Sequence, residues 1–183
     1  MRRVLILLLI FIVVLLVRTI AQPAAGKLFI IGGGDRTEEM VRELIAAAQL
    51  TAKDHIAILP MSGANPDTSY FYIKTDLEKA CTNTIANLNF TKEITNNKIW
   101  LDSLKKAKLI FITGGDQSRF MNLVLNTPVF SAIHEAYNKG ATIAGTSAGA
   151  AVMSKFMITG NQLRGDTVYH STFDRLWDKN IEF

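Results

Sequence analysis

Cysteine is nearly absent from this sequence, since Cys81 is the only one among 183 residues. A single cysteine excludes an intrachain disulfide and any metal site built on several thiolates. A lone cysteine after a helical run is most often a small buried apolar residue. No other group of metal-ligating side chains stands at a recognisable ligand spacing. We therefore predict chemistry without a metal ion and without a cofactor.

A concentrated basic surface is also missing. The formal net charge is +4, but Arg2, Arg3 and Arg18 lie near the N-terminus, and without these three the charge falls to +1. No later cluster of lysine and arginine is interleaved with aromatic residues, as is typical of nucleic-acid-binding proteins. Hydrophobic residues make up 49% and charged residues 20%, a balance that favours a folded domain over a disordered chain. We therefore expect no nucleic-acid partner.

The one long apolar run lies at the N-terminus. Arg2 and Arg3 precede an unbroken apolar stretch at 4–17, and small residues follow at 19–21. This order is typical of a signal peptide, which we place at residues 1–21, and it predicts export to the periplasm or the medium. The run is shorter than the roughly 20 residues that a membrane span requires. We expect the leader to be cleaved, which leaves no stable membrane span. The alternative is that the leader is retained as a membrane anchor.

The rest of the chain, residues 22–183, is interpreted as one α/β domain. It alternates short runs that are apolar on both faces, typical of strands in a covered parallel sheet, with patterns of helical period. We expect strands at 27–31, 55–59, 84–88 and 108–113 and one beginning at Ala141, and helices at 37–50, 68–80, 96–107, 118–125 and 128–138. This order predicts a three-layer α/β/α fold with a mostly parallel central sheet.

Three glycine-rich loops follow predicted strands, at Gly32–Arg36, Gly114–Gln117 and Gly145–Gly149. The carboxyl ends of parallel strands meet at one edge of a sheet, where ligands bind. We therefore expect the three loops to meet at one site. The first loop does not match the dinucleotide-binding fingerprint and no Walker lysine follows it, so a nucleotide site is the weaker interpretation.

The third loop carries the most specific pattern, Gly145-x-Ser147-x-Gly149. In a nucleophile elbow of this spacing, a strained turn between a strand and a helix exposes a hydroxyl above the sheet. Glycine is needed on both sides because the backbone bends sharply and packs closely. The N–H groups of the following helix favour an oxyanion at the same place. We predict that Ser147 is a nucleophile; the alternative is a turn that only joins a strand to a helix.

The loops Gly114–Gln117 and Gly145–Ala150 together resemble those of the cyanophycinase branch of the S51 serine peptidases, which have a glutamine-amidotransferase-like, flavodoxin-like fold. The likeness runs from about Lys27 to Phe183. Further matching segments are Gly33–Arg36, Leu59-Pro60, Leu125–Pro128, Ala151–Ser154 and Met157-Ile158. A glutamine amidotransferase would need cysteine at the apex of the elbow, where Ser147 stands, so that activity is set aside.

The resemblance implies a serine peptidase that hydrolyses aspartyl-containing peptides, β-aspartyl-arginine among them, through an acyl-enzyme on Ser147. It places the oxyanion between the backbone N–H of Ala148 and that of Gly115 or Asp116. It assigns substrate binding to Gln117. The implied partner is a peptide substrate, and a homodimer is one assembly that the sequence allows.

The sequence departs from the family pattern at the residue that would serve as the general base. The family's histidine lies in an Asp-Gln-His stretch downstream of the serine, and an acidic residue follows it. The sequence ends at Phe183 before such a stretch. We therefore expect the sequence to be truncated at its C-terminus and the S51 domain at 22–183 to be incomplete. His170 follows Ser147 in the right order, although closer than the family histidine, and is the alternative base.

The other two histidines, His55 and His134, are interpreted as structural. A serine without a base is a weak nucleophile. The alternative function is therefore a non-catalytic binding module, or an inactive fragment, of the same fold.

Overall fold

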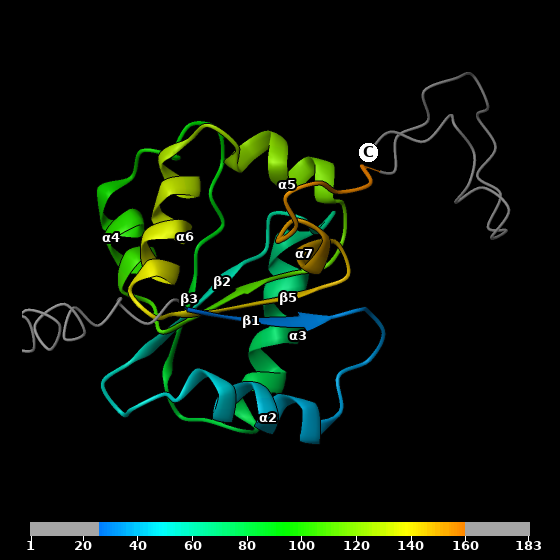
Figure 1. The fold of residues 1–183 in the computed structure, drawn as a ribbon, viewed down its shortest axis with the longest axis vertical. Helices are drawn as coiled ribbons and strands as arrows, with labels where there is room; N and C mark the ends of the chain where they lie inside the picture. The colour runs from blue at the N-terminus through cyan, green and yellow to red at the C-terminus, as the bar shows by residue number, and fades with distance from the viewer. Residues whose placement is uncertain (1–25, 160–183) are drawn as a thin grey trace, which may run out of the picture.

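The computed structural model describes residues 26–159 (Figure 1). In chain order this part comprises β1 (Lys27–Ile31), α2 (Glu38–Ala48), β2 (His55–Leu59), α3 (Pro66–Glu78), β3 (Thr84–Asn87), α4 (Lys98–Lys106), β4 (Leu109–Ile112), α5 (Gln117–Val124), α6 (Pro128–Asn138), β5 (Thr142–Thr146) and α7 (Ala148–Ala151). The predicted signal peptide at 1–21 and the alternative base His170 lie outside the described residues. Within residues 26–159, no helix is long and apolar enough to cross a membrane.

The five described strands form one sheet in the order β1-β5-β4-β2-β3, and every pair in it is parallel. The register aligns Ile31 of β1 with Thr146 of β5, and Ile112 of β4 with Gly145. The carboxyl ends of three neighbouring strands therefore lie at the same level. The prediction of a mostly parallel sheet is confirmed.

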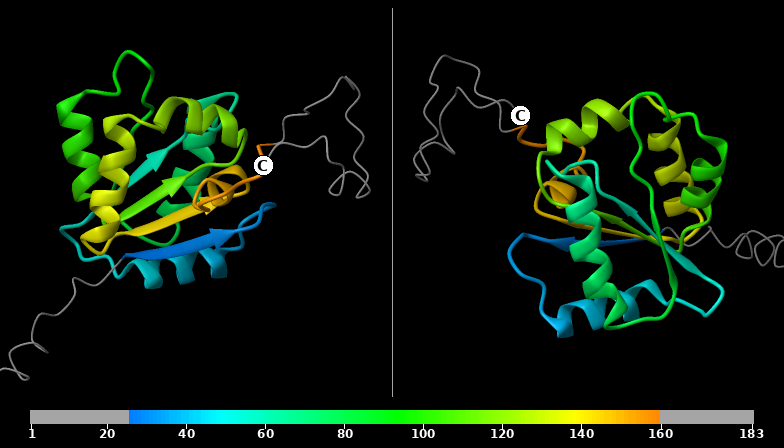
Figure 2. Two further views of the ribbon diagram at one scale, coloured as in Figure 1. Left: turned by 45° about the horizontal axis from the view of Figure 1, so that its top comes forward. Right: turned by 180° about the vertical axis from the view of Figure 1, so that it is seen from behind.

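Helices cover both faces of the sheet, with α2 and α3 on one side and α4, α5 and α6 on the other (Figures 1 and 2). The strands serve both cores because successive side chains point to opposite faces. In β2, Ile56 and Ile58 pack against α2 and α3, whereas Ala57 and Leu59 join the core under α4 to α6. The sequence of β4 alternates in the same way. This confirms the three-layer α/β/α architecture.

Several helices begin directly at the loops of the carboxyl edge because polar side chains cap them. Thr37 accepts a hydrogen bond from the Met40 N–H at 3.2 Å at the start of α2. Asn65 caps α3, and Pro66 occupies its first turn, where a missing N–H costs nothing. The helix therefore begins two residues before the predicted Thr68. These caps fix where each loop ends and each helix starts.

Candidate active site

The loops after β1, β4 and β5 line one cleft of about 250 Å³ at the carboxyl edge of the sheet. Its lining includes Gly33, Gly114 and Ser147, one residue from each loop. A Cβ atom added to Gly114 would lie 3.4 Å from the Cβ of Ser147, and one added to Gly33 would lie 3.7 Å from it. The two glycine loops therefore flank the serine, as the convergence of the three predicted loops requires.

The cleft lies where the connections of neighbouring strands diverge. The chain leaves β1 for α2 on one face of the sheet, while the segment after α7 packs through Met153 against the core of the other face. In open α/β sheets, such a switch point leaves a crevice in which ligands bind. The position of Ser147 between β1 and β4 thus follows from the topology.

Ser147 has a strained backbone, with φ 51° and ψ −113°, and is exposed at the end of a strand that is otherwise buried. A positive φ is uncommon for a residue with a side chain and persists only where the surroundings enforce it. Here the Ser147 N–H donates to the Ile31 carbonyl at 2.9 Å, and the Ser147 carbonyl accepts from the N–H of Ala150 at 2.9 Å. The turn is therefore held from both sides.

The two elbow glycines are required by close packing. A side chain at Gly145 would collide with the Gly149 backbone and the Met153 side chain. A side chain at Gly149 would collide with the backbone carbonyl of Ile112. The spacing seen in the sequence thus reflects contact between β5, the start of α7 and the end of β4.

The backbone N–H groups predicted to bind the oxyanion differ in whether they already have a partner. Among the described residues, no hydrogen bond uses the N–H of Ala148 or of Gly115. The N–H of Asp116 instead donates to the Ser62 carbonyl at 2.9 Å, and the Asp116 side chain caps α5 by accepting from the Arg119 N–H at 2.9 Å. Of the two alternatives predicted in the second loop, only Gly115 keeps an unused N–H group.

Gln117 opens α5, and its side chain is engaged by the segment after α7. Its Nε2 donates to the Ile158 carbonyl at 2.8 Å, and the neighbouring Ser118 hydroxyl donates to the Thr159 carbonyl at 3.1 Å. Gln117 is not among the residues that line the cleft. Its substrate-binding role stays a prediction.

Neither histidine of the described residues lines the cleft. His55 is the first residue of β2, at the amino edge of the sheet, and its Nε2 lies 2.9 Å from the Ser103 carbonyl oxygen. His134 lies on α6 against Phe130, with ring centroids 4.4 Å apart. Within residues 26–159 there is also no group of three or more histidine, cysteine or acidic side chains placed to hold a metal ion.

The family model of peptidase family S51 matches residues 28–176. The chain belongs to peptidase family S51. It is 31% identical over 159 residues to a cyanophycinase of Trichormus variabilis and, to the same extent, to one of a Nostoc species, covering 84% of this chain and 52% of each relative. The chain therefore spans about half the length of these curated relatives. A cyanophycinase of Geminocystis herdmanii is 43% identical over 65 residues, 35% of this chain and 24% of the relative.

Solved structures support the S51 fold. A peptidase from an acI-B1 actinobacterium superposes with a TM-score of 0.62 at 24% identity, covering 75% of this chain and 60% of that one. A putative peptidase E from Listeria monocytogenes EGD-e superposes with a TM-score of 0.52 at 20% identity, covering 71% and 62%. At these identities, the likeness concerns the arrangement of strands and helices.

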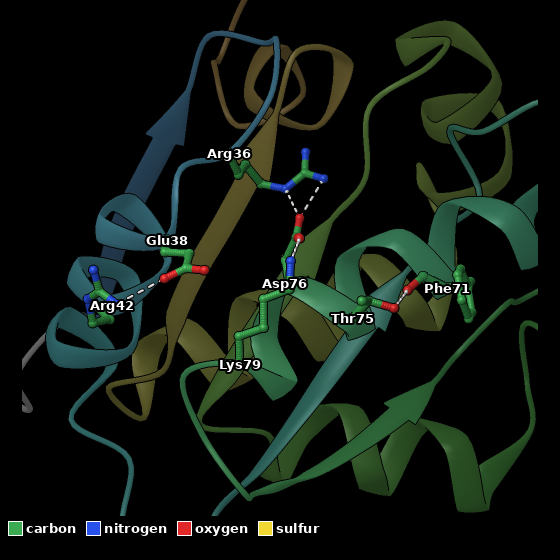
Figure 3. Close-up of polar contacts among 7 residues, drawn as sticks. All are labelled: Arg36, Glu38, Arg42, Phe71, Thr75, Asp76 and Lys79. Atoms are coloured by element: carbon green, nitrogen blue, oxygen red, sulfur yellow. Dashed lines mark hydrogen bonds and ion pairs between the residues drawn. The ribbon is translucent and has the colours of Figure 1, made fainter.

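Two features of this S51 cleft were not predicted from the sequence. Arg36, at the end of the first loop, pairs with Asp76 of α3, and its Nε and Nη2 each lie 2.9 Å from Asp76 Oδ2 (Figure 3). Thr113 lines the cleft and is buried, and its hydroxyl has no hydrogen-bond partner among the described residues. Forty residues separate Arg36 from Asp76, so no local pattern indicates their contact.

The geometry suits attack on a carbonyl group. Ser147 is exposed and lines the cleft, Ala148 follows it in the chain, and Gly115 follows Gly114, which also lines the cleft. Fixed donors directed at a developing oxyanion are a major source of catalysis in acyl transfer. The catalytic roles of Ser147, Ala148 and Gly115 stay predictions.

Proposed function

We propose that the protein is a serine peptidase that hydrolyses aspartyl-containing peptides through an acyl-enzyme on Ser147. The observation that supports this most directly is the exposed, strained Ser147 at the end of β5, lining the cleft in a chain of peptidase family S51. The protein would act without a metal ion or a cofactor.

In the proposed reaction, Ser147 Oγ attacks the scissile carbonyl carbon and gives its proton to a histidine base. The tetrahedral oxyanion accepts hydrogen bonds from the N–H groups of Ala148 and Gly115. Collapse of this intermediate breaks the C–N bond, and the amine leaves with the proton from the base. Water then attacks the acyl-enzyme and restores the serine hydroxyl. The base would come from outside the described residues, with His170 as one candidate.

The proposed substrate class rests on the likeness to the cyanophycinases. Fold and family do not fix a substrate by themselves. We propose a peptide with an aspartyl residue at the scissile carbonyl, β-aspartyl-arginine being the specific candidate. Gln117 would help to hold that residue. Export by the leader at 1–21 would place the reaction in the periplasm or the medium.

Labelling of the full-length protein with a neutral fluorophosphonate tests this proposal. We expect one covalent adduct, which is lost in Ser147→Ala. Ser131→Ala is the matched control, because Ser131 is exposed on α6 and does not line the cleft. Labelling that persists in Ser147→Ala would overturn the assignment.

A second candidate is a binding module that keeps the cleft and performs no catalysis. It is favoured by the finding that neither His55 nor His134 lines the cleft. This function predicts that an aspartyl peptide binds the full-length protein without being cleaved and that Ser147 is not labelled. Turnover that depends on Ser147 would exclude it.

A further inference from the structure

We propose that Arg36 binds a carboxylate of the substrate in the cleft beside Ser147. This inference rests on the proposed function and adds the group that recognises negative charge. Of the described residues that line the cleft, Arg36 alone carries a charge. It reaches the cleft because Gly33 and Gly34, with φ of 134° and 77°, turn the chain after β1.

Asp76 holds the Arg36 side chain in place. Both contacts from Arg36, through Nε and Nη2, converge on the same oxygen of Asp76, and the two side chains are only 16% and 21% exposed. A guanidinium fixed in this way loses little further conformational entropy when it binds a second anion. The ion pair therefore prepares Arg36 for a ligand.

Part of the guanidinium is unused. The third nitrogen, Nη1, points away from Asp76 in Figure 3, and no hydrogen bond or ion pair of the described residues engages it. Arginine carries five N–H donors in a planar fork that suits a carboxylate. Nη1 and the remaining N–H of Nη2 can bind a carboxylate while Asp76 stays in contact.

The local charge favours an anion over a cation. Asp76 also contacts Lys79, whose Nζ lies 3.4 Å from the second carboxylate oxygen. Arg36, Asp76 and Lys79 together carry a net positive charge, and the neighbouring Glu38 and Arg42 neutralise each other as an ion pair at 3.4 Å, so a bound anion would balance the charge. The carboxylate that fills this place belongs either to an acidic side chain or to the C-terminus of the peptide.

A purely structural role for Arg36 gives a different expectation. In that case the ion pair only fixes the loop after β1 to α3, and its loss lowers stability without altering ligand choice. Selectivity between acidic and neutral ligands therefore separates the two roles.

The test measures binding to the full-length Ser147→Ala protein, which cannot turn over its ligand. Calorimetry compares an Asp-Arg dipeptide with its asparaginyl analogue and its C-terminal amide. We expect the dipeptide to bind about tenfold more tightly than one of the two analogues, the usual effect of a charge-assisted hydrogen bond. The analogue that loses affinity identifies the carboxylate that Arg36 binds.

Arg36→Gln in the same background should abolish this preference. Arg42→Gln is the matched control, because Arg42 is exposed on α2 and pairs with Glu38 at 3.4 Å outside the cleft. The control should keep the preference. Equal binding of all three ligands by the parent, or an unchanged preference in Arg36→Gln, would overturn the proposal.

Arg36→Lys keeps the test decisive if Arg36→Gln does not fold. Lysine can retain the charge pair with Asp76 but cannot offer a second planar nitrogen to the ligand. We expect the preference to fall while the melting temperature stays near that of the parent, and an unchanged preference would again overturn the proposal.

Fluorophosphonate labelling of the Ser147-containing protein reports on the peptidase proposal separately. Absence of labelling in the parent would contradict the peptidase proposal and not the binding role of Arg36.

Discussion

The backbone N–H of Ser147 donates to the carbonyl oxygen of Ile31 at 2.9 Å. Ile31 is the last residue of β1 and is in register with Thr146, so this bond continues the β1–β5 ladder one residue past the end of the strand. The end of β1 thus fixes the strained turn that exposes the hydroxyl. The first glycine loop begins immediately after Ile31, which places its residues beside the serine.

Gly145→Ala should destabilise the protein strongly. The new side chain would collide with the Gly149 backbone and with Met153. Overpacking of this kind costs about 1–3 kcal/mol in unfolding free energy. Gly32→Ala is the matched control, since nothing lies within 4 Å of a Cβ atom there. Urea denaturation of both variants gives the comparison, and equal stabilities would contradict the close packing of the elbow.

Asp116→Ala should lower stability by about 1 kcal/mol, because the side chain caps α5. Asp116→Asn keeps an oxygen for the cap and should remain close to the parent. The Asp116 N–H is engaged by Ser62, so neither variant should change the rate at which a fluorophosphonate labels Ser147 by as much as tenfold. A larger loss of labelling in Asp116→Asn would give Asp116 a role beyond the cap.

Thr113→Val should leave the stability unchanged or raise it. The Thr113 hydroxyl is buried and has no hydrogen-bond partner among the described residues. Burying an unpaired hydroxyl costs about 1–3 kcal/mol, and valine has a similar shape without that cost. Thermal unfolding checks this expectation. A clear loss of stability would mean that the hydroxyl is hydrogen-bonded in the protein.

Asp54 should contribute stability that depends on pH. The Thr51 backbone N–H and hydroxyl each donate to Asp54 Oδ2 at 2.7 Å, and these bonds hold the pKa of the Asp54 carboxyl below its ordinary value of 3.8. A carboxyl whose pKa is lowered in the folded state stabilises the protein above its unfolded pKa. That contribution should be complete above about pH 3.8 and be lost as the pH falls through the folded pKa.

Asp54→Asn should therefore be less stable than the parent at pH 7, and the difference should shrink at pH 3. Urea denaturation at the two pH values measures both proteins. The same difference at both pH values would contradict a role for the Asp54 carboxylate.

The sequence predicted the fold well because local and global signals agree. The strands are short and apolar on both faces, and the structure covers both faces with helices. The meeting of the three glycine loops was predicted as well, since the carboxyl ends of parallel strands share one edge. In α3, the helical period of the sequence indicated the helix, but the cap at Asn65 set its beginning at Pro66.

Contacts between distant segments were not predictable from the sequence. The Arg36–Asp76 pair joins residues on separate elements that only the folded chain brings together. The choice between the N–H groups of Gly115 and Asp116 depends on the Ser62 carbonyl, which takes the second of them. The roles of Ser147, Ala148, Gly115 and Gln117 in catalysis and binding stay predictions.

The most direct measurement locates the acyl group itself. The full-length protein would be mixed with an activated ester of an aspartyl peptide and quenched in acid within the first turnover. Tandem mass spectrometry of the digest should find the acyl group on Ser147, and Ser147→Ala should show no adduct. An acyl group on another residue, or release of product in Ser147→Ala at the parental rate, would contradict the proposed role of this serine.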